Sequence, residues 1–255
     1  MTLFTTWLDS NSWLWEIDGL RILVDPWLVE TLVFGDSPWL FEGKRLQPMP
    51  IPEGIDLILL SQGLPDHAHR PTLKQLDKTI PVMASPAGAA VAQELGFNAV
   101  TTLNHGDRVS FQDRLQITAF PGAPVGPVTK ENGYVLSTNA GTSLYYEAHG
   151  YPDGSLKDYG PIDVAITPIV NLELPFSIPV LRGHDGALEL AQQVKPRVML
   201  PTAGSGELEF TGLLTKVLQE KGSADQMQTA LKQAGLSTQV MTTKPGDRLD
   251  LSAYL

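Results

Sequence analysis

One short segment of the chain gathers side chains that could perform chemistry. After the apolar run at 55–60, the sequence reads Ser-Gln-Gly-Leu-Pro-Asp-His-Ala-His-Arg and contains Asp66, His67 and His69. This Asp-His-x-His cluster offers carboxylate and imidazole groups, which zinc, iron and manganese accept as ligands. Asp and His are also common where a helix begins, because they cap its first turn or contact water. The spacing alone leaves a metal site and a capped helix start open.

The composition narrows the class of protein. The chain has 255 residues, and its 18 Lys and Arg against 28 Asp and Glu give a formal net charge of −10, which argues against nucleic-acid binding through clustered cations. It contains no cysteine, so any metal must be held by His, Asp or Glu. No apolar run reaches the roughly 18 residues of a spanning helix, and the first residues lack the pattern of a signal peptide. We therefore expect a cytoplasmic protein that binds neither nucleic acid nor membrane.

The hydrophobic periodicity predicts where strands and helices lie. An Asp-Gly pair at 18–19 between two alternating apolar runs predicts a hairpin, and Ser85 followed by Pro86 predicts a helix start. The expected strands are 3–8, 12–17, 20–25, 55–60, 80–84, 99–103, 108–111, 115–120, 133–138, 142–147, 162–168, 197–201, 237–243 and 248–251. The expected helices are 71–78, 85–96, 186–194, 211–222 and 224–235.

This order of elements repeats one plan twice, with strands first and alternating helices and strands after them. Such a plan predicts two sheets packed face to face with helices outside, which is a four-layer αββα sandwich of the α/β class. We expect a single domain over 1–255.

The segment 26–54 departs from this plan. It carries five prolines together with Trp27, Phe34, Trp39 and Phe41, and it has no clean period. Flexible linkers do not carry large aromatic residues, so we expect an ordered surface insertion. Three interpretations stay open, namely a lid over a cleft, a subunit contact in a homo-oligomer, and packing against a sheet edge.

Several stretches resemble the metallo-β-lactamase superfamily. The run LLSQGLPDHAH is similar to the family signature, in which a strand ends in Ser/Thr-His-x-His-x-Asp-His. RILVDPWL, NHGDRVSF with LQITAFPGAP, SLYYEAHG and RGHDGALELAQQVKPRVMLPTAG resemble later family segments in the same order. The resemblance covers nearly the whole chain and is closest to the lactonase-like, non-lactam branch, with the Gln-Gly-Leu and Glu-Ala-His-Gly forms typical of a cyanobacterial and plastid subgroup.

The chain departs from the family at most of its histidines. Gln62 and Leu64 stand where the first two histidines are expected, and no His occurs in the PGAP stretch at 121–124. The last family histidine falls at Thr202 or Ala203. The first metal site of the family therefore lacks its histidines, and we do not expect the usual two-metal centre.

The resemblance implies a reduced metal site. Asp66, His67 and His149 would hold one zinc, iron or manganese ion, with His69 and Glu147 in reserve for a fourth position. Asp66 would also act as the base that orients water. The alternative is a metal-free remnant in which the same residues bond to one another.

Other residues are candidates for supporting roles. Family precedent makes Asp25 a group that holds the Asp-His loop by accepting backbone hydrogen bonds, and Glu147 would support the ligands in the same way. His184 would act as an acid at the pocket mouth, or it is a surface residue beside a helix start. Gln62, His69 and Tyr146 are candidate contacts to a substrate.

Two functions from different classes follow from these residues. The first is hydrolysis of an ester, lactone or phosphoester by water that a single metal activates. The second is an inactive relative that keeps its pocket as a binding module for a small molecule or a partner. A scaffold that assembles through the aromatic insertion is a third interpretation.

Overall fold

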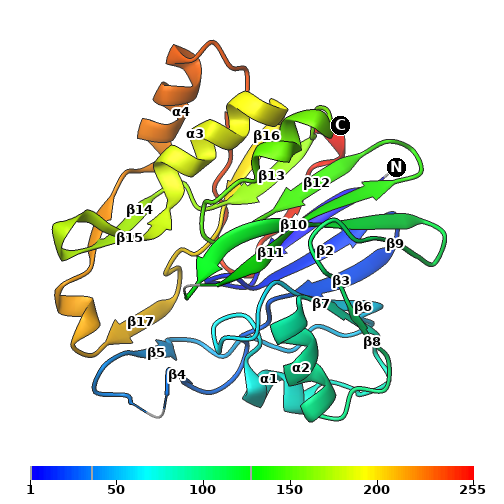
Figure 1. The fold of residues 1–255 in the computed structure, drawn as a ribbon, viewed down its shortest axis with the longest axis vertical. Helices are drawn as coiled ribbons and strands as arrows, with labels where there is room; N and C mark the ends of the chain where they lie inside the picture. Colours follow the sequence, from blue (N-terminus) through cyan, green and yellow to red (C-terminus); the bar gives the residue numbers. More distant parts are fainter. Residues whose placement is uncertain (1, 36, 127) are drawn as a thin grey trace. The chain divides into compact units, whose positions relative to one another are not determined.

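The computed structural model describes residues 2–35, 37–126 and 128–255 (Figure 1). The chain divides into two compact units. Unit 1 comprises Met1–Leu103, Gly204–Val217 and Thr243–Ser252, and unit 2 comprises Asn104–Ala203, Leu218–Thr242 and Ala253–Leu255. The single domain over 1–255 stays a prediction.

Unit 1 is built on a seven-stranded mixed sheet with the order β20-β1-β2-β3-β6-β7-β8. Its strands are β1 (Leu3–Trp7), β2 (Trp13–Ile17), β3 (Leu20–Val24), β6 (Leu57–Leu60), β7 (Val82–Ala84), β8 (Val100–Thr102) and β20 (Arg248–Asp250). The first three are antiparallel, while β6, β7 and β8 continue the sheet in parallel with β3. Asp18 and Gly19 have φ values of 49° and 78°, as a tight two-residue turn requires, so the predicted hairpin is confirmed.

The helices of unit 1 begin where the sequence predicts. Helix α1 (Arg70–Gln75) has proline in its first turn, and α2 (Pro86–Glu94) begins after Ser85, whose hydroxyl accepts a hydrogen bond from the Gly88 N–H. A cluster of buried hydrophobic residues from the sheet and both helices forms a core in the unit. These local signals determine where each helix can begin.

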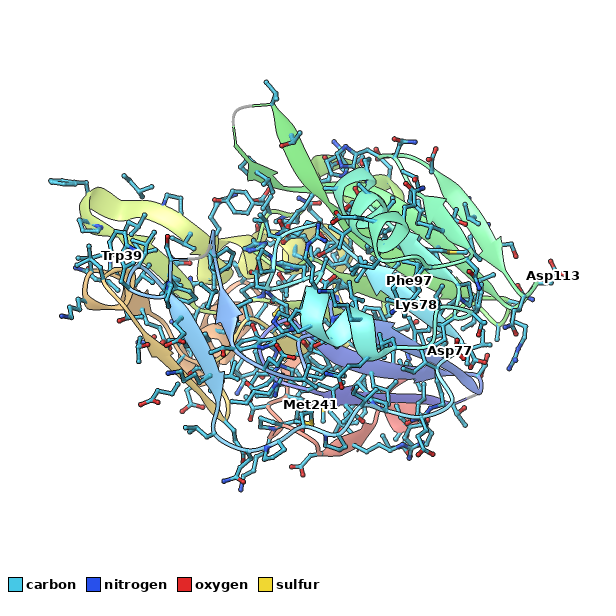
Figure 2. The ribbon with its side chains drawn as sticks, turned by 90° about the horizontal axis from the view of Figure 1, so that it is seen from below. Trp39, Asp77, Lys78, Phe97, Asp113 and Met241 are labelled. Carbon is cyan, nitrogen blue, oxygen red and sulfur yellow. The ribbon has the colours of Figure 1, made fainter. Side chains whose placement is uncertain are left out.

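The 26–54 insertion forms part of a separate small sheet in unit 1. Strands β4 (Leu32–Val33) and β5 (Glu42–Arg45) pair with β17 (Leu208–Thr211) in the order β17-β5-β4. Trp27 is fully buried, and the ring of Phe41 stacks on that of Phe210 with centroids 5.4 Å apart. Packing therefore accounts for these aromatic side chains, whereas Trp39 is 68% exposed at the periphery (Figure 2).

Unit 2 repeats the plan of unit 1. Its seven-stranded sheet has the order β19-β16-β13-β12-β11-β10-β9. The strands are β9 (Arg108–Phe111), β10 (Leu115–Val125), β11 (Thr129–Thr138), β12 (Ser143–Tyr146), β13 (Val164–Thr167), β16 (Val198–Pro201) and β19 (Gln239–Val240), antiparallel up to β12 and parallel after it. Helices α3 (Gly183–Val194) and α4 (Ala224–Gln233) belong to this unit, and the Ser223 hydroxyl caps α4. The predicted repetition of the plan is confirmed.

The prediction of a helix at 211–222 is wrong. This stretch instead contains the 3₁₀ turn η3 (Leu214–Lys216) and strand β18 (Gln219–Lys221). Two of its apolar side chains face away from any core, because Leu213 and Val217 are 52% and 36% exposed. The backbone of β18 pairs with β14 (Asn171–Leu174), which pairs on its other side with β15 (Ile178–Arg182). Pairing between distant segments overrides the local helical pattern here.

Helix α3 lies unusually close to the loop that follows β12. A Cβ on Gly186 would lie 1.9 Å from the carbonyl oxygen of Gly150, and one on Gly183 would lie 2.1 Å from that of Val170. Gly150 itself has a φ of 82°, which other residues rarely adopt. Gly150 and Gly186 therefore set the contact between the first turn of α3 and this loop, and Gly183 sets the contact of the same turn with Val170.

None of the helices in the described part of the chain is both long and apolar enough to cross a membrane.

We predict that Gly186→Ala destabilises the protein, although alanine normally favours a helix by about 1 kcal/mol over glycine. The new methyl group has no space beside the Gly150 carbonyl, so the free energy of unfolding in urea should fall by at least about 2 kcal/mol. Gly154→Ala is the matched control, since nothing lies within 4 Å of a Cβ at that position. Equal stability of the two variants would contradict the close contact.

Candidate metal centre

In unit 1, the carboxylate of Asp25 organises the loop that carries Asp66 and His67. Asp25 follows β3 with a φ of 42° and is fully buried. It accepts hydrogen bonds from the Ser61 N–H at 2.7 Å and from the Ser61 hydroxyl at 2.5 Å. It also bonds to Nδ1 of His67 at 2.8 Å. One buried carboxylate thus fixes both the start of the loop and the orientation of the imidazole.

The imidazole of His67 lies between two carboxylates. Its Nε2 is 3.1 Å from Oδ2 of Asp66, and its Nδ1 faces Asp25. Burial lowers the pKa of His67, but the charges of Asp66 and Asp25 outweigh burial and raise this pKa well above its usual value. The two carboxylates therefore favour the protonated form of His67, and a metal bound at this ring would have to displace that proton.

In unit 2, the backbone that follows β12 holds the carboxylate of Glu147. Its Oε1 accepts a hydrogen bond from the His149 N–H at 3.1 Å. Its Oε2 accepts two more, from the N–H groups of Gly150 at 2.5 Å and Tyr151 at 2.7 Å. Successive backbone N–H groups that converge in this way stabilise an anion.

A second buried glutamate, Glu131 of β11, lies beside Glu147. Oε1 of Glu131 bonds to Nδ1 of His149 at 2.7 Å. The pairing of β10 with β11 shifts register between Pro121 and Pro124, which brings Gly122 opposite the glutamates. A Cβ on Gly122 would lie 2.9 Å from Cγ of Glu131 and 3.3 Å from Cγ of Glu147, so only glycine leaves room for both side chains.

The glutamate pair binds an extra proton in the metal-free protein. Burial, and next the negative charge of Glu131, raise the pKa of Glu147 from its usual value to about 8. Two carboxylates this close cannot both be charged at low cost, so near neutral pH they share a proton. A bound cation could take the place of this proton, because it would also reduce the repulsion between the two carboxylates.

Glu131, Glu147 and His149, which we call the unit 2 trio, fit a metal ion. One ligand atom from each residue lies within 4.8 Å of the others. The phenol O–H of Tyr145 is fully buried with no hydrogen-bond partner among the described residues, and it lies beside Gly133 and Glu147. Two carboxylates and one imidazole form a ligand set that manganese, iron and zinc accept.

The predicted site residues are divided between the two units of the chain. Asp25, Asp66 and His67 lie together in unit 1, and Glu147 lies with His149 in unit 2. The predicted ligand set of Asp66, His67 and His149 draws on both units and stays a prediction.

Sequence reasoning missed Glu131. Glu131 stands between Lys130 and Asn132, before the strand predicted at 133–138, so no local signal showed that its side chain is buried.

The remaining candidates take different positions. His69 is buried, with Nδ1 at 3.0 Å from the Thr72 hydroxyl and Nε2 at 3.3 Å from the Thr31 carbonyl oxygen, and burial lowers its pKa to about 4. Both of its ring nitrogens thus bond within unit 1. Gln62 is buried and Tyr146 fully so. His184 lies in the first turn of α3, where its side chain is 30% exposed.

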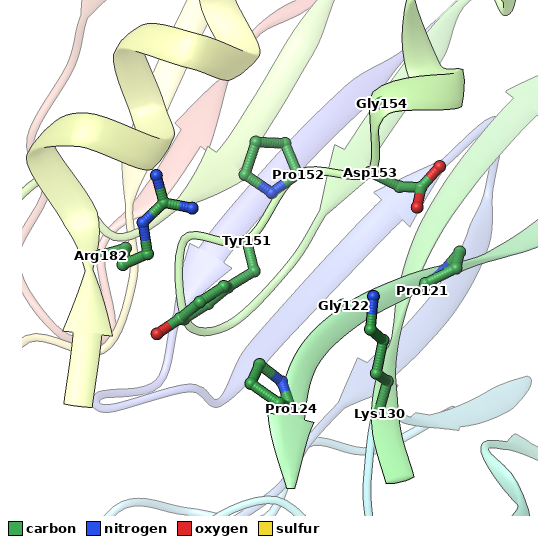
Figure 3. Close-up of a pocket in the computed structure, with 9 residues that line it drawn as sticks. All are labelled: Pro121, Gly122, Pro124, Lys130, Tyr151, Pro152, Asp153, Gly154 and Arg182. Carbon is green, nitrogen blue, oxygen red and sulfur yellow. The ribbon is translucent and has the colours of Figure 1, made fainter. Parts of the chain in front are cut away.

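A cavity of about 350 Å³ lies in unit 2 (Figure 3). It is lined by Pro121, Gly122, Pro124, Lys130, Tyr151, Pro152, Asp153, Gly154 and Arg182. Gly122 contacts the glutamate pair, and the Tyr151 N–H bonds to Glu147. The cavity and the unit 2 trio therefore share a wall.

The chain is similar to known proteins over nearly its full length. A UPF0173 metal-dependent hydrolase of Methanopyrus kandleri is 24% identical over 252 residues, which cover 95% of this chain and 97% of that protein. The structure resembles Igni18, a metallo hydrolase of Ignicoccus hospitalis, with a TM-score of 0.66 and 16% identity over 98% of both chains. An isothiocyanate hydrolase from Delia radicum gut bacteria has a TM-score of 0.71 and 14% identity over 96% of this chain and 98% of its own. These likenesses show a shared fold.

The family model that describes the beta-lactamase superfamily domain matches residues 5–203. This match covers most of the chain and includes the loops that carry His67 and His149. The expected fold class is confirmed as α/β and metallo-β-lactamase-like. The chain belongs to the metallo-β-lactamase superfamily.

Proposed function

We propose that this protein is a metal-dependent hydrolase whose metal is held by the unit 2 trio, Glu131, Glu147 and His149. The observation that carries the proposal is the approach of two buried carboxylates and an imidazole to within 4.8 Å of one another. The names of two similar proteins, a metal-dependent hydrolase and a metallo hydrolase, support the same class of reaction. Its substrate would be an ester, a lactone or a phosphoester.

Hydrogen bonds fix the side chains of the trio in the positions that a cation would require. Three backbone N–H groups fix Glu147, and Nδ1 of His149 faces Glu131. A bound metal would supply a Lewis acid that lowers the pKa of water into the neutral range. The proton that the glutamates share would leave when the cation arrives, since the cation replaces it in balancing their charge.

The rival assignment is the set predicted from the sequence, Asp66, His67 and His149. His149 is common to both sets, so its substitution does not separate them. Glu131 belongs only to the unit 2 trio, and Asp66 belongs only to the rival. These two residues therefore decide between the assignments.

We expect chelator-treated protein to bind about one equivalent of zinc, manganese or ferrous iron per chain after incubation and dialysis. Glu131→Gln should weaken this binding by about 10- to 100-fold, because the amide cannot supply the second charge. Elemental analysis by mass spectrometry measures the metal retained. Glu220→Gln, on the exposed strand β18, is the control and should retain it. Full retention by Glu131→Gln together with loss in Asp66→Asn would favour the rival set.

A second prediction concerns the reaction. The loaded protein should hydrolyse at least one of p-nitrophenyl acetate, γ-butyrolactone and bis(p-nitrophenyl) phosphate, and a chelator should abolish the rate until metal is restored. Glu131→Gln should lower kcat/KM by about 10- to 100-fold. If the loaded protein turns over none of the three, the inactive binding module is the better interpretation.

A third prediction concerns the metal-free protein. The folded pKa of Glu147, about 8, lies above its usual 4.5, so the stabilisation from this group is complete below pH 4.5 and is lost as the pH rises through 8. Urea unfolding should show that Glu147→Gln becomes more stable than the wild type as the pH increases, with a differential slope of up to about 1.4 kcal/mol per pH unit. Metal should stabilise the wild type and not the variant. Parallel pH profiles for the two proteins would show that the glutamate pair is not coupled.

A further inference from the structure

We propose that the cavity beside the unit 2 trio binds the non-reacting end of the substrate, and that this end is an oxyanion on a flat apolar group. This inference rests on the proposed function and names its substrate class. An aryl carboxylate or an aryl phosphate is the chemistry that fits.

The size and walls of the cavity set the apolar part of the ligand. A volume of about 350 Å³ accommodates a single ring with its substituents. Pro121, Pro124 and Pro152 line the cavity with rigid apolar surface, and the ring of Tyr151 adds an aromatic face. Rigid walls of this kind favour a flat group that loses little entropy on binding.

Two cations set the charge of the ligand. Arg182 and Lys130 approach the cavity from opposite sides in Figure 3. The guanidinium carbon of Arg182 lies 5.3 Å from the centroid of the Tyr151 ring, a contact that orients its planar fork of donors. In a chain with a net charge of −10, a cavity with two cations stands out as a place that attracts anions.

Asp153 and Glu189 lie near these cations but do not neutralise their positive charge. Asp153 lines the cavity, but its Oδ1 accepts hydrogen bonds from the N–H and hydroxyl of Ser155, and its carboxylate points away from Tyr151 in Figure 3. Glu189 lies 3.5 Å from one terminal nitrogen of Arg182, and both side chains are more than a third exposed. An exposed ion pair of this length contributes little free energy. Arg182 can therefore still donate two hydrogen bonds to an oxyanion.

The cavity adjoins the reacting group of the proposed hydrolase. Tyr151 lines the cavity through its ring and donates its N–H to Oε2 of Glu147 at 2.7 Å. Gly122 lines the cavity and contacts both glutamates. A substrate anchored at Arg182 would therefore extend toward the unit 2 trio, and its anchor would position the bond to be cleaved.

The test is direct binding of small probes measured by calorimetry. Benzoate and phenyl phosphate should bind, whereas the neutral isostere benzamide should bind at least about tenfold more weakly. Arg182→Gln should weaken benzoate binding about tenfold, and Arg182→Lys should give an intermediate loss because it keeps the charge without the fork. Lys232→Gln removes the same charge from the exposed face of α4 and should change the affinity less than about twofold. The ratio of the phenyl phosphate and benzoate affinities identifies which oxyanion the cavity prefers.

Equal binding of benzamide and benzoate would overturn the proposal, as would benzoate affinity unchanged in a folded Arg182→Gln. The measurements are made on both chelator-treated and metal-loaded protein. Anion binding that depends on Arg182 in a chain that retains no metal would support the cavity and refute the hydrolase. Metal binding and hydrolysis without probe binding would refute the cavity and leave the proposed function standing.

Discussion

Burial of Glu131 and Glu147 side by side is the constraint around which unit 2 is arranged. Two carboxylates removed from water repel each other and lose hydration, so the surrounding structure must supply compensating partners. It does so with backbone N–H groups on Glu147, the imidazole of His149 on Glu131, and a proton held by the raised pKa of Glu147. The β-bulge that places Gly122 opposite the pair provides the space. A cation would satisfy the same requirement more fully.

In unit 1 the buried carboxylate is stabilised by hydrogen-bond donors of the protein. Asp25 is surrounded by donors from Ser61 and His67, so its charge is stabilised within the protein. The imidazole of His67 lies between Asp25 and Asp66, whose charges raise its pKa. In unit 1 a cationic imidazole thus balances buried carboxylates, whereas in unit 2 two carboxylates lie side by side.

The loop after β12 links the trio to the cavity and to helix α3. Within it, Glu147 and His149 are the proposed ligands, Gly150 meets α3 at a distance only glycine allows, and Tyr151 lines the cavity. Arg182, the residue before α3, faces the same cavity. A shift of α3 would therefore disturb the proposed ligands and the wall of the cavity together, because tight packing transmits displacement.

Local signals in the sequence were sufficient for much of the fold. Asp18-Gly19 predicted the hairpin, Ser85 predicted a helix start, and the alternation of elements predicted the repeated plan, because turns, caps and periodicity act between near neighbours. The tertiary structure decided the rest. It made 219–221 a strand by pairing it with β14, and it brought Glu131 to His149 through the register of β10, β11 and β12. Such contacts join residues far apart in the chain, so no local pattern encodes them.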